Sequence, residues 1–428
     1  MKKIILLLAA LFALWACSKS ESEPEREVGL DDIVFDFSVK HPATKGTPKG
    51  WVKGDAVYVF FQDINTGYLV LTYNGEKWNS SFKGTARATD LASSGKQLGA
   101  VYMPYGIKLN PVFNDGKWEI GDQSCYFMVA ENVPYTYTSN PSTDEHRISA
   151  SISMTVPSRF VQFFIPDEEA TGTIQIACNG IQRCYITKIL TEDNALNIYW
   201  NNNYTQVFTA YAATVDGEKG YYLSGRLNGY ATVTDYLFIA EKSGHTYTFF
   251  KHLDNELAGG NAVRLPSFSS TKWIETGADK HVWIHNIKWG TVNVGATSPL
   301  DAGTKFEWKW TEEDWASAGV PAGWSVPGQE MVENLLINGT NKYHINIHIG
   351  DDSKYCLVLV DSEVPDHFLI LPYTQTSYGY LGEYWTSTIH DGSNQTAYYL
   401  VLEYITDVHS SIAHCSILHT LPVRAVKF

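Results

Sequence analysis

Cys17 stands where an apolar segment ends and a polar, acidic segment begins, which places its thiol for covalent modification during export. Lys2 and Lys3 precede an apolar run over residues 4–15. This run is shorter than the roughly 20 residues that a membrane-spanning helix needs. A positive start followed by a short apolar run is the layout of a secretory signal. The sequence therefore predicts a signal peptide over residues 1–16.

The four residues Leu-Trp-Ala-Cys that end at Cys17 resemble a bacterial lipobox. Leu14 and Ala16 occupy their usual positions, and Trp15 stands where a small residue is common. The resemblance implies cleavage before Cys17 and acylation of its thiol. Stable anchoring takes two lipid chains or more, which a lipoprotein cysteine carries. The alternative is an ordinary signal peptide with an incidental cysteine.

Residues 17–30 contain glutamates and serines but few residues that form a core, so we expect a flexible acidic tether. Similar acidic stretches accompany surface export in Bacteroidetes-type lipoproteins. By this analogy, we expect a lipid anchor in the outer membrane of a Gram-negative Bacteroidetes-type bacterium, with the chain on the cell surface at least before any processing.

The composition indicates which classes of partner the chain can bind. The net charge of −14 argues against nucleic acid, which needs a basic face. Aromatic residues make up 14% of the chain, with 26 Tyr and 13 Trp. They favour strands, and their rings offer amphipathic faces to ligands, although we expect most of them in sheet cores.

The cysteines after Cys17 are five in number, so at least one has no partner within the chain. Cys178 and Cys184 are spaced for a hairpin bridge, and Cys356 and Cys415 are candidates for joining two strands. No CxxC occurs, so the sequence predicts neither a zinc framework nor a cofactor.

Catalytic fingerprints are missing from the sequence. It contains no GxSxG, HExxH, P-loop or GxGxxG pattern. His344 and His348 would stand about 13 Å apart along a regular strand, too far to share one metal. We therefore predict no catalytic residue, no metal site and no enzyme activity. A carboxylate pair for glycoside hydrolysis has no fixed spacing in sequence and remains an alternative.

The elements that would position these residues are mostly strands. Ile33, Phe35, Phe37 and Val39 alternate with other residues, as in a half-buried strand. The pairs at 74–75, 115–116 and 243–244 are hairpin turn signals, and such spacing favours antiparallel sandwiches. Polar segments at 139–147 and 268–281 suggest linkers. They divide the chain into domains at 31–145, 146–272 and 280–428.

The first two of these domains resemble fimbrillin-like proteins, the type V pilus subunits. The resemblance implies two tandem antiparallel β-sandwiches on the cell surface. In pilus-forming members, a protease cuts after a basic residue, the first strand leaves, and a neighbour's strand replaces it by donor-strand exchange. Lys45 stands at that position in place of arginine and is the predicted processing site, or else an ordinary solvated lysine. The matching residues are Thr44, Lys45, Gly46, Trp51, Gly54, Asp55 and residues 57–61.

The last domain differs from the first two in that its sequence contains helix signals. Thr311 and Pro327 each begin a helix signal, over 311–319 and 327–339. Blocks at 289–295, 323–327, 382–388 and 422–426 resemble the Fibrobacter succinogenes major paralogous domain, which implies an α+β, C-type-lectin-like fold. Ser325 replaces a usual arginine, and Ala425 replaces a common cysteine. The expected fold class is therefore mostly β, with two sandwiches followed by a lectin-like domain.

A ligand site is expected in the loop over 373–383 and just after it. The calcium-binding motifs of lectins are missing, so we expect aromatic stacking with a few polar bonds. We accordingly predict a cell-surface adhesin, the tip subunit of a fimbrillin-type pilus, which accepts a donor strand and binds a glycan or protein ligand. The alternative is a permanently anchored glycan-binding lipoprotein. The candidate ligand-binding residues are Tyr378, Tyr380, Glu383, Asp391 and Asn394.

Overall fold

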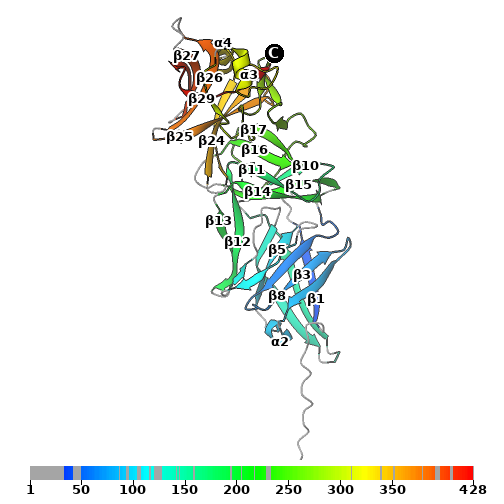
Figure 1. Cartoon of the computed structure of the whole chain (residues 1–428). Helices are drawn as coiled ribbons and strands as arrows, with labels where there is room; N and C mark the ends of the chain where they lie inside the picture. The colour runs from blue at the N-terminus through cyan, green and yellow to red at the C-terminus, as the bar shows by residue number, and fades with distance from the viewer. Residues whose placement is uncertain are drawn as a thin grey trace, which may run out of the picture.

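A computed structural model describes most of the chain between residues 33 and 427. Three regions follow one another along a long axis in chain order, from the first sheet at one end to the C-terminal region at the other (Figure 1). The described ranges are 33–41, 50–85, 87–92, 96–103, 108–114, 117–119, 128–140, 142–143, 145–157, 160–192, 195–203, 205–215, 217–227, 233–309, 311–337, 340–349, 352–377, 379–390, 396–404 and 408–427.

The first region is a seven-stranded sheet in the order β1-β9-β8-β5-β2-β3-β4. Strand β1 lies at one edge and pairs with β9 in parallel, from Ile33 opposite His146 to Lys40 opposite Ser153. A short helix and a small hairpin accompany the sheet. The elements are β1 (Ile33–Lys40), β2 (Ala56–Phe61), β3 (Gly67–Tyr73), β4 (Trp78–Gly84), α2 (Ala88–Leu91), β5 (Gln97–Met103), β6 (Val112–Asn114), β7 (Lys117–Glu119), β8 (Met128–Asn140) and β9 (Glu145–Ser153).

The segment 139–147 is a hairpin, so its prediction as a linker is wrong. Strands β8 and β9 pair across it, from Asn140 opposite Glu145 to Tyr135 opposite Ala150. Ile148 and Ile152 of β9 are buried in the same core as Ile33. The first sheet therefore runs to Ser153, past the expected boundary at residue 145, because polar turn residues serve hairpins as well as linkers.

The second region is a ten-stranded sheet. Its main order is β13-β12-β15-β14-β11-β16-β17-β19, and β10 pairs with both β15 and β18. The long hairpin of β12 and β13 reaches back along the first region, where it contacts β5, β7 and β8 (Figure 1). The strands are β10 (Phe160–Pro166), β11 (Thr173–Cys178), β12 (Ile181–Glu192), β13 (Ala195–Asn203), β14 (Val207–Val215), β15 (Glu218–Leu227), β16 (Asp235–Lys242), β17 (His245–His252), β18 (Ala262–Arg264) and β19 (Ile274–Thr276).

The segment 268–281, the second expected linker, belongs in part to this sheet. Its strand β19 pairs with β17. Trp273 is buried, and its indole N–H donates to the Pro266 carbonyl at 2.9 Å. The prediction of a free linker here is wrong, because the polar residues on either side conceal a buried aromatic anchor.

The C-terminal region combines a six-stranded antiparallel sheet, two smaller sheets and two helices. Both helix signals are confirmed, and Thr311 forms the expected capping box with Asp314. The mostly-β fold class is confirmed as well. The elements are β20 (His281–Ile284), β21 (Ile287–Gly290), β22 (Lys305–Glu307), α3 (Glu312–Ser317), α4 (Gln329–Ile337), β23 (Thr340–Ile349), β24 (Asp352–Asp361), β25 (Phe368–Thr376), β26 (Gly379–Ile389), β27 (Thr396–Tyr404), β28 (Val408–Ser416), β29 (Thr420–Pro422) and β30 (Val426–Lys427).

The six-stranded sheet has apolar packing on both faces. One face covers α4 and the β20–β21 hairpin. The other packs on the second region, where Leu237 and Phe250 meet Ile345 and Phe368 in one buried cluster. Beside this cluster, the amide of Gln206 donates to the His348 carbonyl at 2.7 Å. The second and C-terminal regions therefore share a core and are not joined by a linker alone.

The cysteines with described side chains are unpaired. Cys178, Cys356 and Cys415 are free thiols, so neither expected disulfide is present. Cys356 is buried in the cluster shared with the second region, whereas Cys415 packs against a separate cluster that contains Trp385. The two thiols therefore belong to different cores of the C-terminal region.

Candidate ligand-binding site

Five aromatic side chains gather on one face of the six-stranded sheet and are called here the aromatic cluster. The ring of His344 stacks on Tyr404 with centroids 3.8 Å apart and planes 5° apart. Tyr355 and Tyr380 are 4.3 Å apart, and Tyr373 lies 5.6 Å from His344. Each of five consecutive strands contributes one ring. The members are His344 on β23, Tyr355 on β24, Tyr373 on β25, Tyr380 on β26 and Tyr404 on β27.

The register of the sheet explains this gathering. Tyr355 lies directly opposite Tyr373, and Tyr380 lies directly opposite Tyr404. Side chains that are cross-strand partners point to the same face, so the rings meet. The sheet also curls until its edge strands approach, since Lys342 of β23 donates to Ser410 of β28 at 2.7 Å. This curl brings His344 onto Tyr404.

The cluster is uncharged at neutral pH. Burial lowers the pKa of His344 to about 4, so its imidazole carries no charge at pH 7. The Nδ1 atom of His344 contacts the hydroxyl of Tyr373. Burial also raises the pKa of Tyr373, which keeps this hydroxyl protonated. The cluster therefore offers neutral ring faces and hydroxyl groups.

A cavity of about 480 Å³ is lined in part by Tyr355 and Tyr373, two members of the aromatic cluster, and Tyr373 is itself only 8% exposed. Its remaining walls come from the ends of β24 and β25 and from the loop at 300–302. The hydroxyl of Tyr355 donates to Gln375 at 3.3 Å, so one wall is already ordered. The polar lining includes Asp301, Asp352, Ser353, Lys354, Thr374 and Gln375.

The loop at 300–302 is held by its own contacts. Asn293 donates to the carbonyls of Asp301 and Ala302 at 3.3 and 2.9 Å. Gly303 has a φ of 72°, and a Cβ there would lie 2.5 Å from the Val294 carbonyl oxygen. Only glycine fits that approach. The Asp301 wall of the cavity is therefore positioned by the backbone around it.

This arrangement suits a small saccharide. The volume falls in the usual range for ligand pockets, about 300–1,000 Å³. An apolar sugar face can lie on a tyrosine ring, and carboxylate and amide oxygens accept hydrogen bonds from sugar hydroxyls. The cavity supplies both kinds of group on adjacent walls.

The predicted site residues are only partly brought together. Tyr380 belongs to the aromatic cluster, behind Tyr355. Glu383 is on the same strand three residues later, so it points to the opposite face and contacts Tyr399. The segment 373–383 is the hairpin of β25 and β26, and its description as a loop is wrong. The predicted residues Cys17, Lys45, Tyr378, Asp391 and Asn394 lie outside the described residues.

Sequence reasoning missed Tyr355, Lys354 and Asp301 as site residues. In the segment Asp-Ser-Lys-Tyr-Cys, a polar strand start precedes an apolar run, which marks the end of a buried strand. That pattern was the available signal for Tyr355. Trp385 is buried and donates to the Phe306 carbonyl at 2.7 Å, in line with the expectation that most aromatic residues lie in sheet cores.

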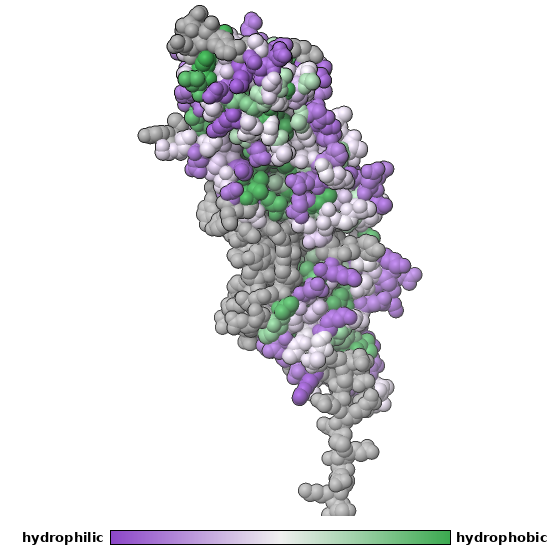
Figure 2. Space-filling model, in the orientation of Figure 1, coloured by the Kyte–Doolittle hydropathy of each residue, from purple (hydrophilic) through white to green (hydrophobic). Residues whose placement is uncertain are grey.

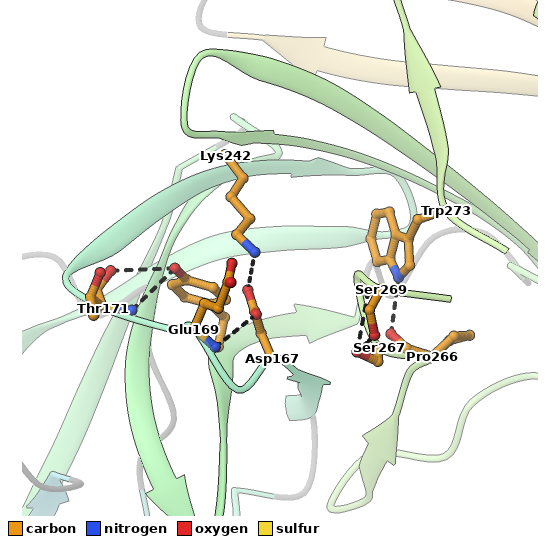
Figure 3. A network of polar contacts seen from close by, with 9 residues as sticks. Asp167, Glu169, Thr171, Lys242, Pro266, Ser267, Ser269 and Trp273 are labelled. Atoms are coloured by element: carbon orange, nitrogen blue, oxygen red, sulfur yellow. Dashed lines mark hydrogen bonds and ion pairs between the residues drawn. The ribbon is translucent and has the colours of Figure 1, made fainter. Parts of the chain in front are cut away.

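A second cavity, of about 1,080 Å³, lies at the end of the second region. Figure 3 shows Lys242 pointing at Asp167, and these two groups lie 2.5 Å apart. Arg264 forms two hydrogen bonds with Glu218. The lining also includes Glu168, Glu169 and Lys219.

Two further properties bear on the class of site. Among the described residues, no group of three or more His, Cys, Asp or Glu side chains is placed to hold a metal ion. No helix in the described part of the chain is long and apolar enough to cross a membrane. The described residues on the face shown in Figure 2 mix hydrophobic and hydrophilic groups, without one large apolar area.

Comparisons with known proteins found a few distant structures. No family model matches the chain, and no curated protein matches it. One similar crystal structure is described as a "putative cell adhesion protein" of Bacteroides ovatus, with 12% identity, a TM-score of 0.27, and coverage of 57% of this chain and 94% of the other. A "putative adhesin" of Bacteroides ovatus has 10% identity, a TM-score of 0.22, and coverage of 54% and 89%. A "putative cell adhesion protein" of Bacteroides thetaiotaomicron has 11% identity, a TM-score of 0.20, and coverage of 54% and 90%.

Proposed function

We propose that this protein is a cell-surface adhesin that binds a saccharide in the cavity beside Tyr355 and Tyr373. The cavity itself is the observation that carries the proposal, since it joins two tyrosine rings to a polar rim. The lipobox at Cys17 supports an anchor in the outer membrane. In the chain, the anchor precedes the first region, and the cavity belongs to the region at the far end of the described chain (Figure 1).

Binding is tested with the full chain after removal of the signal segment, on an array of saccharides. The variant Tyr355→Ala removes one ring from the cavity wall and should weaken binding about tenfold, the equivalent of about 1.4 kcal/mol of lost stacking. The matched control Tyr247→Ala alters the second cavity and should leave binding unchanged. Binding of a neutral saccharide that survives Tyr355→Ala at full strength would refute the assignment.

The role of tip subunit rests on strand β1. It is an edge strand, and Ile33 and Val39 are buried in the core of the first region, with Phe35 and Phe37 packed against it. Loss of this strand would uncover an apolar groove and the unpaired backbone of β9, which an incoming strand can fill. Lys45 follows β1 in the chain, so cleavage there would separate the strand from the rest of the protein.

Digestion distinguishes the tip subunit from a permanently anchored lipoprotein. A trypsin-like protease should cut the folded chain at Lys45, and a synthetic peptide with the sequence of residues 33–40 should then bind the truncated protein. Lys45→Gln should abolish this cut and supplies the control. A wild-type chain that stays intact after Lys45 would favour the anchored alternative.

A further inference from the structure

The outer face of the small β20–β21–β30 sheet carries a group of side chains outside both cavities. Along β20, Val282 and Ile284 are buried, while His281 and Trp283 point outward. Trp283 is 44% exposed, and it is the aromatic member of the large hydrophobic side chains that are exposed in the described chain. Trp289, on the neighbouring strand, is buried. A tryptophan exposed to this extent is available to a ligand.

Two lysines lie beside this tryptophan. Lys288 is directly opposite Trp283 across the strands, and Lys427 is directly opposite Lys288. The ammonium of Lys288 lies 4.8 Å from the ring centroid of Trp283, and that of Lys427 lies 5.8 Å from the ring of Trp324. Five residues thus form one surface, called here the tryptophan–lysine face: His281, Trp283, Lys288, Trp324 and Lys427.

The positive charge of this face is not compensated within the described chain. The ion pairs there include neither Lys288 nor Lys427. Burial and the two nearby ammonium groups lower the pKa of His281. Like charges directly across a strand pair are destabilising, so this pairing has a cost that an anionic ligand would offset. In the second cavity, by contrast, Lys242 and Arg264 each have a carboxylate partner.

The imidazole of His281 lies near both indoles. Its centroid is 6.2 Å from that of Trp283 and 6.3 Å from that of Trp324, with the ring planes 77° and 64° apart. The rings therefore do not form one flat surface, and a single sugar ring would stack on one indole. The lysines offer charge to the acidic groups of such a ligand.

We propose that the tryptophan–lysine face binds an acidic saccharide, with a sugar ring on Trp283 and its carboxylate or sulfate groups on Lys288 and Lys427. The site is separate from the cavity beside Tyr355, so it stands even if that cavity binds nothing. The chain's net charge of −14 disfavours nucleic acid and an anionic membrane as partners, while a local anionic group still meets two lysines. A membrane would also need a larger apolar area than this face provides.

The test measures binding of the full chain to four probes by titration calorimetry: polygalacturonate oligosaccharides, sulfated heparin oligosaccharides, neutral dextran and inorganic polyphosphate. Each titration is made with the Tyr355→Ala chain, so that the cavity does not contribute. Binding to at least one of the two acidic saccharides, and none to dextran, is expected there. The double variant Lys288→Gln, Lys427→Gln should weaken that binding at least tenfold, and Trp283→Ala should do the same. The exposed Lys83 lies on β4 in the first region, so Lys83→Gln is the matched charge control and should bind like wild type.

The outcomes separate the alternatives. Trp283→Ala should leave polyphosphate binding unchanged, since that probe has no sugar face. Equal loss in Lys83→Gln, or saccharide binding indifferent to Trp283→Ala, would overturn the proposal and show general ion exchange. Binding to phosphatidylglycerol vesicles with a blue shift of tryptophan fluorescence that Trp283→Ala removes, without saccharide binding, would assign the face to membranes instead. Tyr355→Ala should not affect this site. Unfolding curves of each variant show that the fold is intact.

Discussion

The partly buried imidazole of His344 makes the free energy of unfolding depend on pH. The pKa of His344 is about 4 in the folded chain, below the ordinary value of 6.5. The folded state therefore binds the proton less well than the unfolded state does. This histidine contributes stability that is fully present above pH 6.5 and is lost progressively as the pH falls from 6.5 towards 4.

The size of the effect follows from the shift. One pKa unit corresponds to about 1.36 kcal/mol, so the full shift would be worth about 3.4 kcal/mol well below pH 4, about 3 kcal/mol at pH 4 and about 2 kcal/mol at pH 5. His344 is only about half-buried, so solvent screening reduces these values. We expect a loss of about 1 kcal/mol between pH 7 and pH 5 that comes from His344 alone.

The assay compares wild type with His344→Phe by urea unfolding at pH 7 and pH 5. The difference between the two proteins cancels the other titrating groups. Wild type should lose about 1 kcal/mol more than His344→Phe over this interval. The contact of His344 with the Tyr373 hydroxyl should break on protonation, so saccharide affinity should fall in parallel. An NMR titration that places the pKa of His344 near 6.5 would refute the reasoning.

Three other perturbations test separate parts of the structure. Phe250→Ala should destabilise the second and C-terminal regions by about 3–5 kcal/mol and split their unfolding in denaturant, and a single unchanged transition would contradict a shared core. Thr311→Ala should cost about 1 kcal/mol by thermal unfolding and Thr311→Ser almost nothing, and equal losses would exclude the capping role. Lys288→Gln should stabilise the chain by about 0.2–1 kcal/mol and raise the pKa of His281 in an NMR titration, and a lowered pKa would contradict the described electrostatics.

Local chemistry was readable from the sequence. Ser243 and Gly244 both have positive φ, 53° and 80°, as their turn signal predicts between β16 and β17. Between β3 and β4, Gly75 has a φ of 104°, but Asn74 does not have a positive φ and the loop spans residues 74–77, so the two-residue turn is not formed there. Thr311 begins a helix, as its signal predicts. Each of these features depends on a few neighbouring residues, so their side chains alone determine the result.

Long-range pairing was not readable. The parallel match of β1 with β9 joins segments more than a hundred residues apart, and no local pattern encodes it. The same limit explains the site. Tyr380 was identified, but its partner Tyr355 is brought beside it by sheet register. Glu383 is a candidate ligand-binding residue only if residues 373–383 form a loop. In a strand, Glu383 stands three residues after Tyr380, so its side chain points to the opposite face of the sheet.

The buried junction between Phe250 and Phe368 fixes how the C-terminal region is oriented on the second region. Because apolar side chains of both regions pack together there, the C-terminal region cannot rotate on the second region. Its cavity therefore keeps one orientation relative to the long axis. Neighbouring copies anchored in one membrane would then hold their cavities in the same orientation relative to their long axes. Under the proposed function, a polysaccharide with repeated sugars could bind several copies at once. The avidity of this multivalent binding would then exceed the affinity of one site.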